Sequence, residues 1–313
     1  MLIDHLLEGI FAVNGINKSS EEEKILYLKS LRKSATKLWN SYQDQKPDAV
    51  YDSKEAQECY LLRYFPPYSY FLVEELSQLE TSYFEDKNSY TVSFFGAGPG
   101  PEMIGLLRFL GGFYSSSFSH KISKIKVNLF DQGSWNHSRK IIINHVIPKY
   151  WDYKNININS YETNFSSKAF WQFPENREKL IIKSDLVVFQ NCFNEISPVD
   201  YGQTTENISG ILDHLSDGSL IVFIDQEVGR YQSISDMLNQ IINLDHQSSD
   251  IYTVKSLDSS TLNQSHIISG YPSIIDENIY YKENSVIGYA EGLVLRKNYP
   301  YSSLILTKIS SPF

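Results

Sequence analysis

The sequence predicts an α/β fold: a mostly parallel sheet of seven strands with an antiparallel C-terminal hairpin, preceded by a helical segment. Two observations support this prediction. After residue 89, short runs of β-branched and aromatic residues alternate with helical stretches. The last two apolar runs, 291–297 and 299–309, flank Asn298-Tyr299-Pro300 without room for a helix between them. We therefore expect them to pair as an antiparallel hairpin at one edge of the sheet.

The chain divides into two predicted parts: a helical N-terminal cap over residues 1–89 and an α/β domain over residues 90–313. In the cap, Ser19 or Ser20 precedes an acidic first turn and a helix with apolar residues at helical spacing. A second helix covers 53–64, and a third begins near Pro67. The expected parallel strands are 91–95, 125–130, 157–161, 185–190 and 219–224, and the expected helices of this domain are 101–110, 135–147, 203–215 and 233–243.

Composition limits the classes of function. The 313 residues are 42% hydrophobic, so the chain can bury a large core, and its net charge of −9 disfavours binding of bulk nucleic acid. The N-terminus carries Asp4, His5 and Glu8 where a signal peptide would be basic and then apolar, and no run of 18 apolar residues occurs. We therefore expect a cytoplasmic protein without a membrane partner. The sequence carries no signal for its oligomeric state.

The stretch TVSFFGAGPGPEM, residues 91–103, places Gly96, Gly98 and Gly100 between a predicted strand and a predicted helix. Gly96 permits a sharp turn, and the two glycines after it let the backbone approach a ligand that a Cβ atom would exclude. A nicotinamide dinucleotide is the competing ligand. Its fingerprint, G-x-G-x-x-G/A, requires a small residue where this chain has Pro101. The alternative is a glycine-rich turn that binds nothing.

Asp131 ends the second predicted strand, in KIKVNLFDQGSW, 35 residues after Gly96. An acid at this position can accept hydrogen bonds from both hydroxyls of a ribose. The alternative is that Asp131 only caps the following helix.

The glycine loop, Asp131 and the terminal hairpin together resemble class I S-adenosylmethionine (SAM)-dependent methyltransferases, over roughly residues 90–310. The resemblance implies a Rossmann-like methyltransferase fold with SAM as cofactor, its methionine part against the glycine loop and its ribose against Asp131. Glu162 or Asn164, after the third strand, would contact the adenine amino group. The residues implied to bind the cofactor are Gly96, Ala97, Gly98, Gly100, Glu102, Asp131, Gln132, Glu162, Asn164, Gln190 and Asn191.

The fourth predicted strand leads into the polar residues of SDLVVFQNCFNEI. The resemblance implies that this loop passes close to the sulfonium, so Asn191 and Glu195 are the candidate catalytic residues. Members that methylate planar amines typically carry Asn/Asp-Pro-Pro-Tyr/Phe here, and this chain lacks both prolines. Asn194 and Glu195 could instead cap a helix. Asp225 and Glu227 are further candidate bases, but no convincing third acid joins them, so we expect no metal ion.

Residues Arg63, Tyr64 and Tyr68, in CYLLRYFPPYSYF just before the α/β domain, are the candidate substrate-binding residues. Arg63 could hold an anionic group and the tyrosines could line a pocket. The alternative is that this aromatic stripe packs the helices onto the sheet. A long segment, 246–288, separates the fifth strand and its helix from the hairpin, and we interpret it as an insertion that serves as a substrate lid or wall. The alternative is a surface loop without a role in binding.

The chain is also similar to a family of methyltransferase-like proteins associated with the mitochondrial small ribosomal subunit, through YLLRYFPPYSYFLVEEL and the segment from Asp185 to Ile196. That family typically carries cysteines that bind a metal, whereas this chain has only Cys59 and Cys192. We therefore expect a SAM-dependent methyltransferase acting on a small-molecule or peptide/protein acceptor. The alternative is a catalytically inactive scaffold or SAM-binding protein with the same fold.

Overall fold

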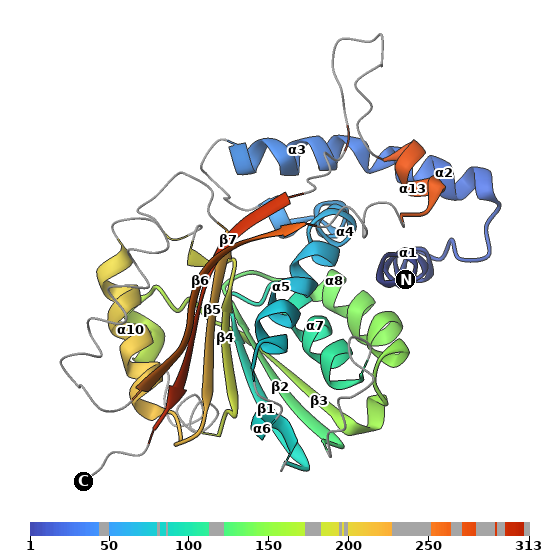
Figure 1. The fold of residues 1–313 in the computed structure, drawn as a ribbon. Helices are drawn as coiled ribbons and strands as arrows, with labels where there is room; N and C mark the ends of the chain where they lie inside the picture. Colours follow the sequence, from blue (N-terminus) through green and yellow to red (C-terminus); the bar gives the residue numbers. More distant parts are fainter. Residues whose placement is uncertain are drawn as a thin grey trace.

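Seven strands form one sheet in the order β3-β2-β1-β4-β5-β7-β6 (Figure 1). The computed structural model describes residues 1–43, 50–79, 82–85, 87–112, 122–172, 183–193, 196, 200–226, 252–263, 271–279, 292 and 298–309. Five strands run parallel: β1 (Ser89–Phe95), β2 (Lys124–Asp131), β3 (Ile156–Glu162), β4 (Leu186–Gln190) and β5 (Leu220–Gln226). The last two, β6 (Tyr252–Asn263) and β7 (Asn298–Lys308), pair antiparallel. The predicted fold class is confirmed.

The expected partner of the last strand was wrong. β7 lies between β5 and β6 and pairs antiparallel with both, so no place beside it remains for 291–297. Asn298-Tyr299-Pro300, expected to be the turn, is the start of β7 itself. The true partner is β6, whose sequence is YTVKSLDSSTLN. This sequence is too polar to be predicted as a strand of the sheet. It also falls inside the segment interpreted as a lid, so that interpretation does not hold for 252–263.

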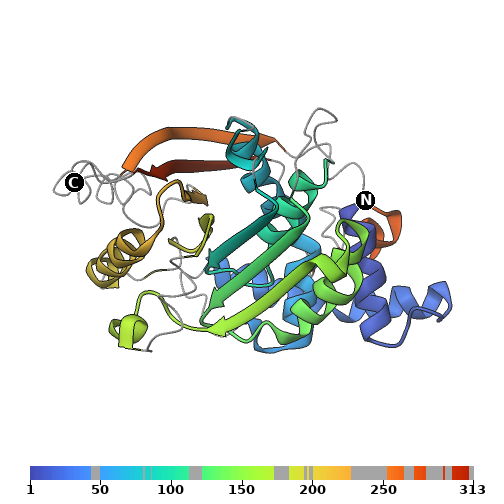
Figure 2. The ribbon, with the colours of Figure 1, turned by 90° about the horizontal axis from the view of Figure 1, so that it is seen from below.

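Helices cover both faces of the sheet (Figures 1 and 2). α10 (Tyr201–His214) lies on one face, and α5 (Phe65–Ser77), α7 (Pro101–Leu110) and α8 (Asn136–Ile141) lie on the other. α8 continues into a π-helical turn, η2 (Ile142–Val146), and short 3₁₀ turns follow at η3 (Ile147–Lys149), η4 (Tyr153–Asn155) and η5 (Lys168–Gln172). The helix expected over 233–243 lies outside the described residues.

The N-terminal segment is helical as predicted. Its elements are α1 (Leu2–Val13), α2 (Glu21–Ser30), α3 (Arg32–Gln43), η1 (Val50–Asp52), α4 (Lys54–Arg63) and the short α6 (Ser82–Glu85). Ser20 caps α2 by accepting from the Glu23 backbone N–H, and Glu23 accepts in return from the Ser20 N–H. A further short helix, α13 (Ser273–Asn278), contacts the start of α3 through the backbone carbonyl of Asn278, which accepts from Arg32 Nε.

The two faces of the sheet bury separate hydrophobic clusters because side chains alternate along each strand. On the α10 face, five aromatic rings from five neighbouring strands lie in register, with adjacent centroids 4.7 to 5.0 Å apart. They are Tyr161, Phe130, Phe95, Phe189 and Phe223. This ladder includes the last residue of β1 and the residues one before the carboxyl ends of β2 and β4, where it supports the loops described below.

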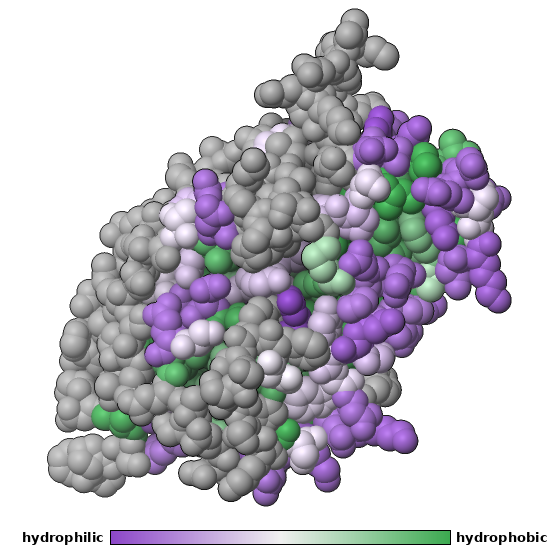
Figure 3. Space-filling view, turned by 45° about the vertical axis from the view of Figure 1, so that its right-hand side comes forward, coloured by the Kyte–Doolittle hydropathy of each residue, from purple (hydrophilic) through white to green (hydrophobic). Residues whose placement is uncertain are grey.

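Hydrophilic residues cover most of the right-hand side of the space-filling view, with smaller hydrophobic areas between them (Figure 3). Leu26 of α2 is one large hydrophobic side chain that is exposed. Within the part of the chain that the structure describes, no helix has both the length and the apolar character needed to cross a membrane.

Candidate functional site

The loop between β1 and α7 requires glycine at each alternate position. Gly96, Gly98 and Gly100 have φ angles of +63°, +51° and +87°, in the left-handed region that side chains with a Cβ rarely adopt. A Cβ on Gly96 would lie 2.4 Å from the Cβ of Cys192, so this glycine also permits close packing of the loops after β1 and β4. The sequence therefore folds here into a tight turn that ends at the first turn of α7.

Asp131 holds this loop to the end of β2. Its Oδ2 accepts from the Gly98 N–H at 2.7 Å, and its Oδ1 accepts from the Gly133 N–H at 2.8 Å and from Trp135 Nε1 at 3.0 Å. Asp131 thus stabilises the turn into α8, as the capping alternative expected, and also bridges to the glycine loop. A carboxylate has about four acceptor positions, so Oδ2 keeps room for one further donor.

Arg139 and Glu102 lie on the other side of the glycine loop. Arg139, on α8, donates from Nε to the Gly98 carbonyl at 2.9 Å. Glu102, in the first turn of α7, is 2% exposed. Burial raises the pKa of Glu102 well above its usual value; its own backbone N–H lowers it, Asp131 raises it further and Arg139 lowers it. The raised pKa favours the neutral carboxyl group beside the loop.

A pH dependence of stability follows from Glu102. Because its pKa is raised in the folded protein, the unfolded chain ionises first, and stability falls as pH rises from about 4.5 to the folded-state pKa. We expect Glu102→Gln to remove this decline, so that the variant gains stability relative to wild type as pH rises. Urea unfolding across this range measures it, with Glu206→Gln on the exposed face of α10 as control. A constant difference between Glu102→Gln and wild type at every pH would contradict the prediction.

The residues expected at the adenine end are exposed. Gln132 follows Asp131, and Glu162 lies beside Asp131 in the register of β2 and β3. Asn164 uses its side-chain oxygen locally, accepting from the Ser166 N–H at 2.9 Å. Of the two alternatives left open by the sequence, Glu162 is therefore the one whose side chain stands next to Asp131 with its carboxylate exposed.

A polar cluster stands at the carboxyl ends of β4 and β5. Gln190 donates to the Tyr68 carbonyl at 2.9 Å, and Gln226 donates to the Tyr68 hydroxyl at 2.7 Å and to Asn191 Oδ1 at 3.3 Å. Asn191 adopts a left-handed backbone with φ of +53°. Among the described residues, Gln190 Oε1 and Asn191 Nδ2 are buried without a hydrogen-bond partner. These two atoms can therefore serve a polar ligand at this edge.

Some of the remaining acids make structural hydrogen bonds, and others lie outside the described residues. Asp225 is fully buried and accepts from the backbone N–H groups of Phe193 and Gln226, both at 2.7 Å, so it holds the turn after β4. Asp185, at the start of β4, accepts from the Thr91 N–H and pairs with Lys87. Glu195, Asn194 and Glu227 lie outside the described residues. Gln226 was not predicted, because an amide between the acids Asp225 and Glu227 carries no distinctive sequence signal.

An aromatic group joins α4 and α5 to both loops. Tyr60 lies edge-on to Trp135 with ring centroids 5.1 Å apart, and Trp135 packs against Gly98 at 3.6 Å from an ideal Cβ position. Tyr60 also contacts Tyr64 and Tyr68, with centroids at 5.3 and 6.2 Å. The predicted substrate residues therefore do pack as an aromatic stripe, and the same stripe forms a wall from the glycine loop to the polar cluster.

Arg63 lies beside Tyr64 of this wall and is 2% exposed. Its guanidinium carbon lies 4.8 Å from the ring centroid of Trp39 and 4.7 Å from that of Tyr64. Burial lowers the pKa of Arg63, but Tyr64, Tyr299 and Tyr68 around it raise the pKa by more, so the group is charged at neutral pH. No cluster of three metal-binding side chains occurs among the residues that the structure describes.

No protein-family model matches the sequence, and no curated protein matches it. Solved structures do resemble the fold. Precorrin-6y C5,15-methyltransferase from Geobacter metallireducens is 12% identical, over 72% of this chain and 84% of that chain, with a TM-score of 0.39. A loganic acid methyltransferase solved with S-adenosylhomocysteine (SAH) is 10% identical, over 79% and 93%, with a TM-score of 0.41. An rRNA methylase from Streptococcus thermophilus is 13% identical, over 74% and 92%, with a TM-score of 0.36. At such identities the likeness describes the fold alone.

The site fits an adenosyl cofactor in two respects. The left-handed glycine loop leaves the backbone bare of Cβ atoms at the carboxyl end of β1, and Asp131 retains an acceptor position beside it. The buried oxygen of Gln190 and the buried amide nitrogen of Asn191 add unpartnered polar atoms at the neighbouring strand end.

Proposed function

We propose that the protein is a SAM-dependent methyltransferase that acts on a small-molecule or peptide/protein acceptor. The supporting observation is the hydrogen bond from the Gly98 N–H to Asp131, which joins a loop of three left-handed glycines to the end of β2 at the carboxyl edge of the sheet. Open α/β sheets bind ligands at this edge, where the strand order reverses between β1 and β4.

Each candidate residue has a distinct role in this proposal. Gly96, Ala97, Gly98 and Gly100 present backbone to the amino-acid end of the cofactor, with Glu102 behind them. Asp131 accepts from the ribose, and Gln132 and Glu162 face the adenine end, with Asn164 beside them. SAM when bound supplies an activated methyl group, so the protein needs chiefly to hold the acceptor in line with it.

The polar cluster is the proposed place of the acceptor atom. Gln190 Oε1 can accept a hydrogen bond from the acceptor and Asn191 Nδ2 can donate one. The Tyr68 carbonyl holds the Gln190 side chain, and Gln226 holds that of Asn191. Asn191 and Glu195 remain the candidate catalytic residues. We place the boundary between the helical cap and the methyltransferase domain at residues 89 and 90. We place the protein in the cytoplasm because its two cysteines are too few for a disulfide framework.

Cofactor binding tests the proposal directly. We expect calorimetry to show binding of SAM and SAH and none of NADH. Asp131→Asn should weaken SAH binding by about 10- to 100-fold, because it removes a charged acceptor from the ribose. Asp152→Asn, at an exposed turn with similar local hydrogen bonds, is the matched control and should bind SAH as wild type does. Thermal unfolding must show Asp131→Asn folded; a folded wild type that binds neither adenosyl ligand refutes the proposal.

A second candidate is an inactive scaffold or SAM-binding protein with this fold. Two observations favour it. Asp131 already accepts three hydrogen bonds from the chain itself, and Asp225 accepts a backbone hydrogen bond that holds the turn after β4. Methyl turnover distinguishes the two candidates: SAH binding without transfer to any acceptor in a broad screen supports the scaffold. The similarity to the family associated with the mitochondrial small ribosomal subunit stays a prediction that no comparison tests.

A further inference from the structure

Arg63 is a buried cation that the proposed transfer of a methyl group does not itself require. It is 2% exposed, and its Nε and Nη1 atoms have no hydrogen-bond partner among the described residues. The described groups around it are the rings of Trp39 and Tyr64, with Tyr68 and Tyr299 nearby, and none of these is an acid. Removing a charge from water costs several kcal/mol unless an anion and hydrogen bonds compensate it. The ring contacts, together with the Tyr64 side chain, compensate only part of this cost.

The chemistry of the neighbours indicates the kind of anion. A carboxylate is the anion that a single buried guanidinium pairs with most readily, through charge-assisted hydrogen bonds. Tyr68 joins Arg63 to the polar cluster, because its hydroxyl accepts from Gln226 and Gln226 also bonds Asn191. Tyr299 of β7 lies edge-on to Tyr68, with ring centroids 6.3 Å apart. A planar, aromatic body would therefore meet ring faces and edges between the charge and the strand ends.

We propose that Arg63 binds the carboxylate of the methyl acceptor, and that the acceptor is an aromatic carboxylic acid. This inference rests on the proposed function, since it names the substrate class of the same site. Trp39 on α3 is only half-buried, whereas Tyr64, Tyr68 and Tyr299 are buried, so the anion enters from the side of Trp39. Arg63 is a binding residue here, and the transfer itself takes place at the polar cluster.

A stability measurement separates binding from a structural role. Arg63→Met replaces a buried charge that no described anion pairs with by an apolar side chain of similar length, so we expect the ligand-free variant to melt at the same temperature as wild type or higher. Arg139→Met is the matched control: Arg139 is also buried but donates to the Gly98 carbonyl, so its loss should lower the melting temperature. A fall for Arg63→Met as large as for Arg139→Met would show that Arg63 is a structural residue and would overturn the inference.

Ligand titrations then test the carboxylate. Wild type should bind benzoate at least about tenfold more tightly than benzamide, its uncharged isostere, and Arg63→Met should lose that preference. Arg63→Lys should keep part of it, because lysine retains the charge but not the paired N–H groups. Equal binding of benzoate and benzamide to wild type overturns the inference, and so does binding of inorganic phosphate in preference to benzoate.

The cofactor carries a carboxylate of its own, so SAH is titrated into the same variants. We expect Arg63→Met to bind SAH within about threefold of wild type. A loss of SAH affinity as large as that for benzoate would assign Arg63 to the cofactor and overturn its assignment to the acceptor. Failure of wild type to bind SAH at all refutes the proposed function, whereas the benzoate titration still reports on the anion site by itself.

Discussion

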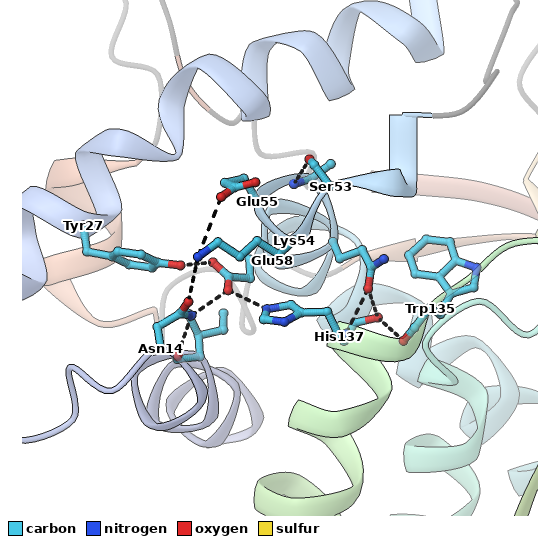
Figure 4. Close-up of polar contacts among 12 residues, drawn as sticks. Asn14, Tyr27, Ser53, Lys54, Glu55, Glu58, Trp135 and His137 are labelled. Carbon is cyan, nitrogen blue, oxygen red and sulfur yellow. Dashed lines mark hydrogen bonds and ion pairs between the residues drawn. The ribbon is translucent and has the colours of Figure 1, made fainter.

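Glu58→Ala should lower the free energy of unfolding by about 3 kcal/mol, the largest effect we expect from one substitution. Glu58 is fully buried on α4 and accepts three hydrogen bonds: from the Tyr27 hydroxyl at 2.6 Å, from Asn14 Nδ2 at 2.7 Å and from His137 Nε2 at 2.7 Å (Figure 4). These donors come from α2, from the end of α1 and from α8. One carboxylate thus joins α1, α2 and α4 of the cap to α8 on the face of the sheet, and its removal takes this acceptor from all three donors.

Urea unfolding of wild type and Glu58→Ala measures this loss. Glu55→Ala is the matched control on the same helix, because Glu55 is partly exposed and only 3.9 Å from Lys54, a surface pair worth less than about 1 kcal/mol. Glu58→Gln should fall between the two, since it keeps one acceptor oxygen and places an amide against the donors. If Glu58→Ala unfolds at the same urea concentration as Glu55→Ala, the carboxylate does not hold the cap.

Gly105→Ala should destabilise the protein by about 2 kcal/mol, although alanine is the better helix former. Gly105 lies inside α7, where a Cβ would come 2.2 Å from the backbone carbonyl oxygen of Ser69 on α5. Helix propensity favours the substitution by about 1 kcal/mol, and the clash with the backbone of a neighbouring helix outweighs it. Because α5 carries Tyr68, the displacement should also weaken the support of Gln190 and Gln226.

The same substitution elsewhere has the opposite sign. Gly202, in the first turn of α10, has nothing within 4 Å of an ideal Cβ, so Gly202→Ala should stabilise the protein by about 0.5 to 1 kcal/mol. Unfolding of both variants beside wild type makes the comparison internal. A gain in stability for Gly105→Ala would mean that α5 and α7 are less closely packed than the structure has them.

The parallel strands were predictable because each is a short apolar run followed by polar or glycine residues. The helix over 201–214 and the capped helix after Ser20 carried equally local signals. The pairing of β7 with β6 was missed because residues 252–263 alternate little and their partner lies 35 or more positions away. A tight turn depends on a few neighbouring residues, so it can be predicted from the sequence. When a long segment connects two strands, their pairing depends instead on which edge of the sheet is still open.

For the candidate site, the sequence alone indicated the candidate positions: the glycines, Asp131, the amides after β4, and Arg63. Glycine at a left-handed turn and a charged residue in an apolar stretch are conspicuous because the backbone or the solvent otherwise forbids them. What the side chains do there was decided by tertiary structure. Packing of α4 and α5 over the strand ends brings Tyr68 to Gln226 and leaves Arg63 buried between two rings. Pairing of β1 with β2 brings Asp131 to Gly98. Such contacts join residues far apart in the chain, so they depend on burial and distance, which no local pattern encodes.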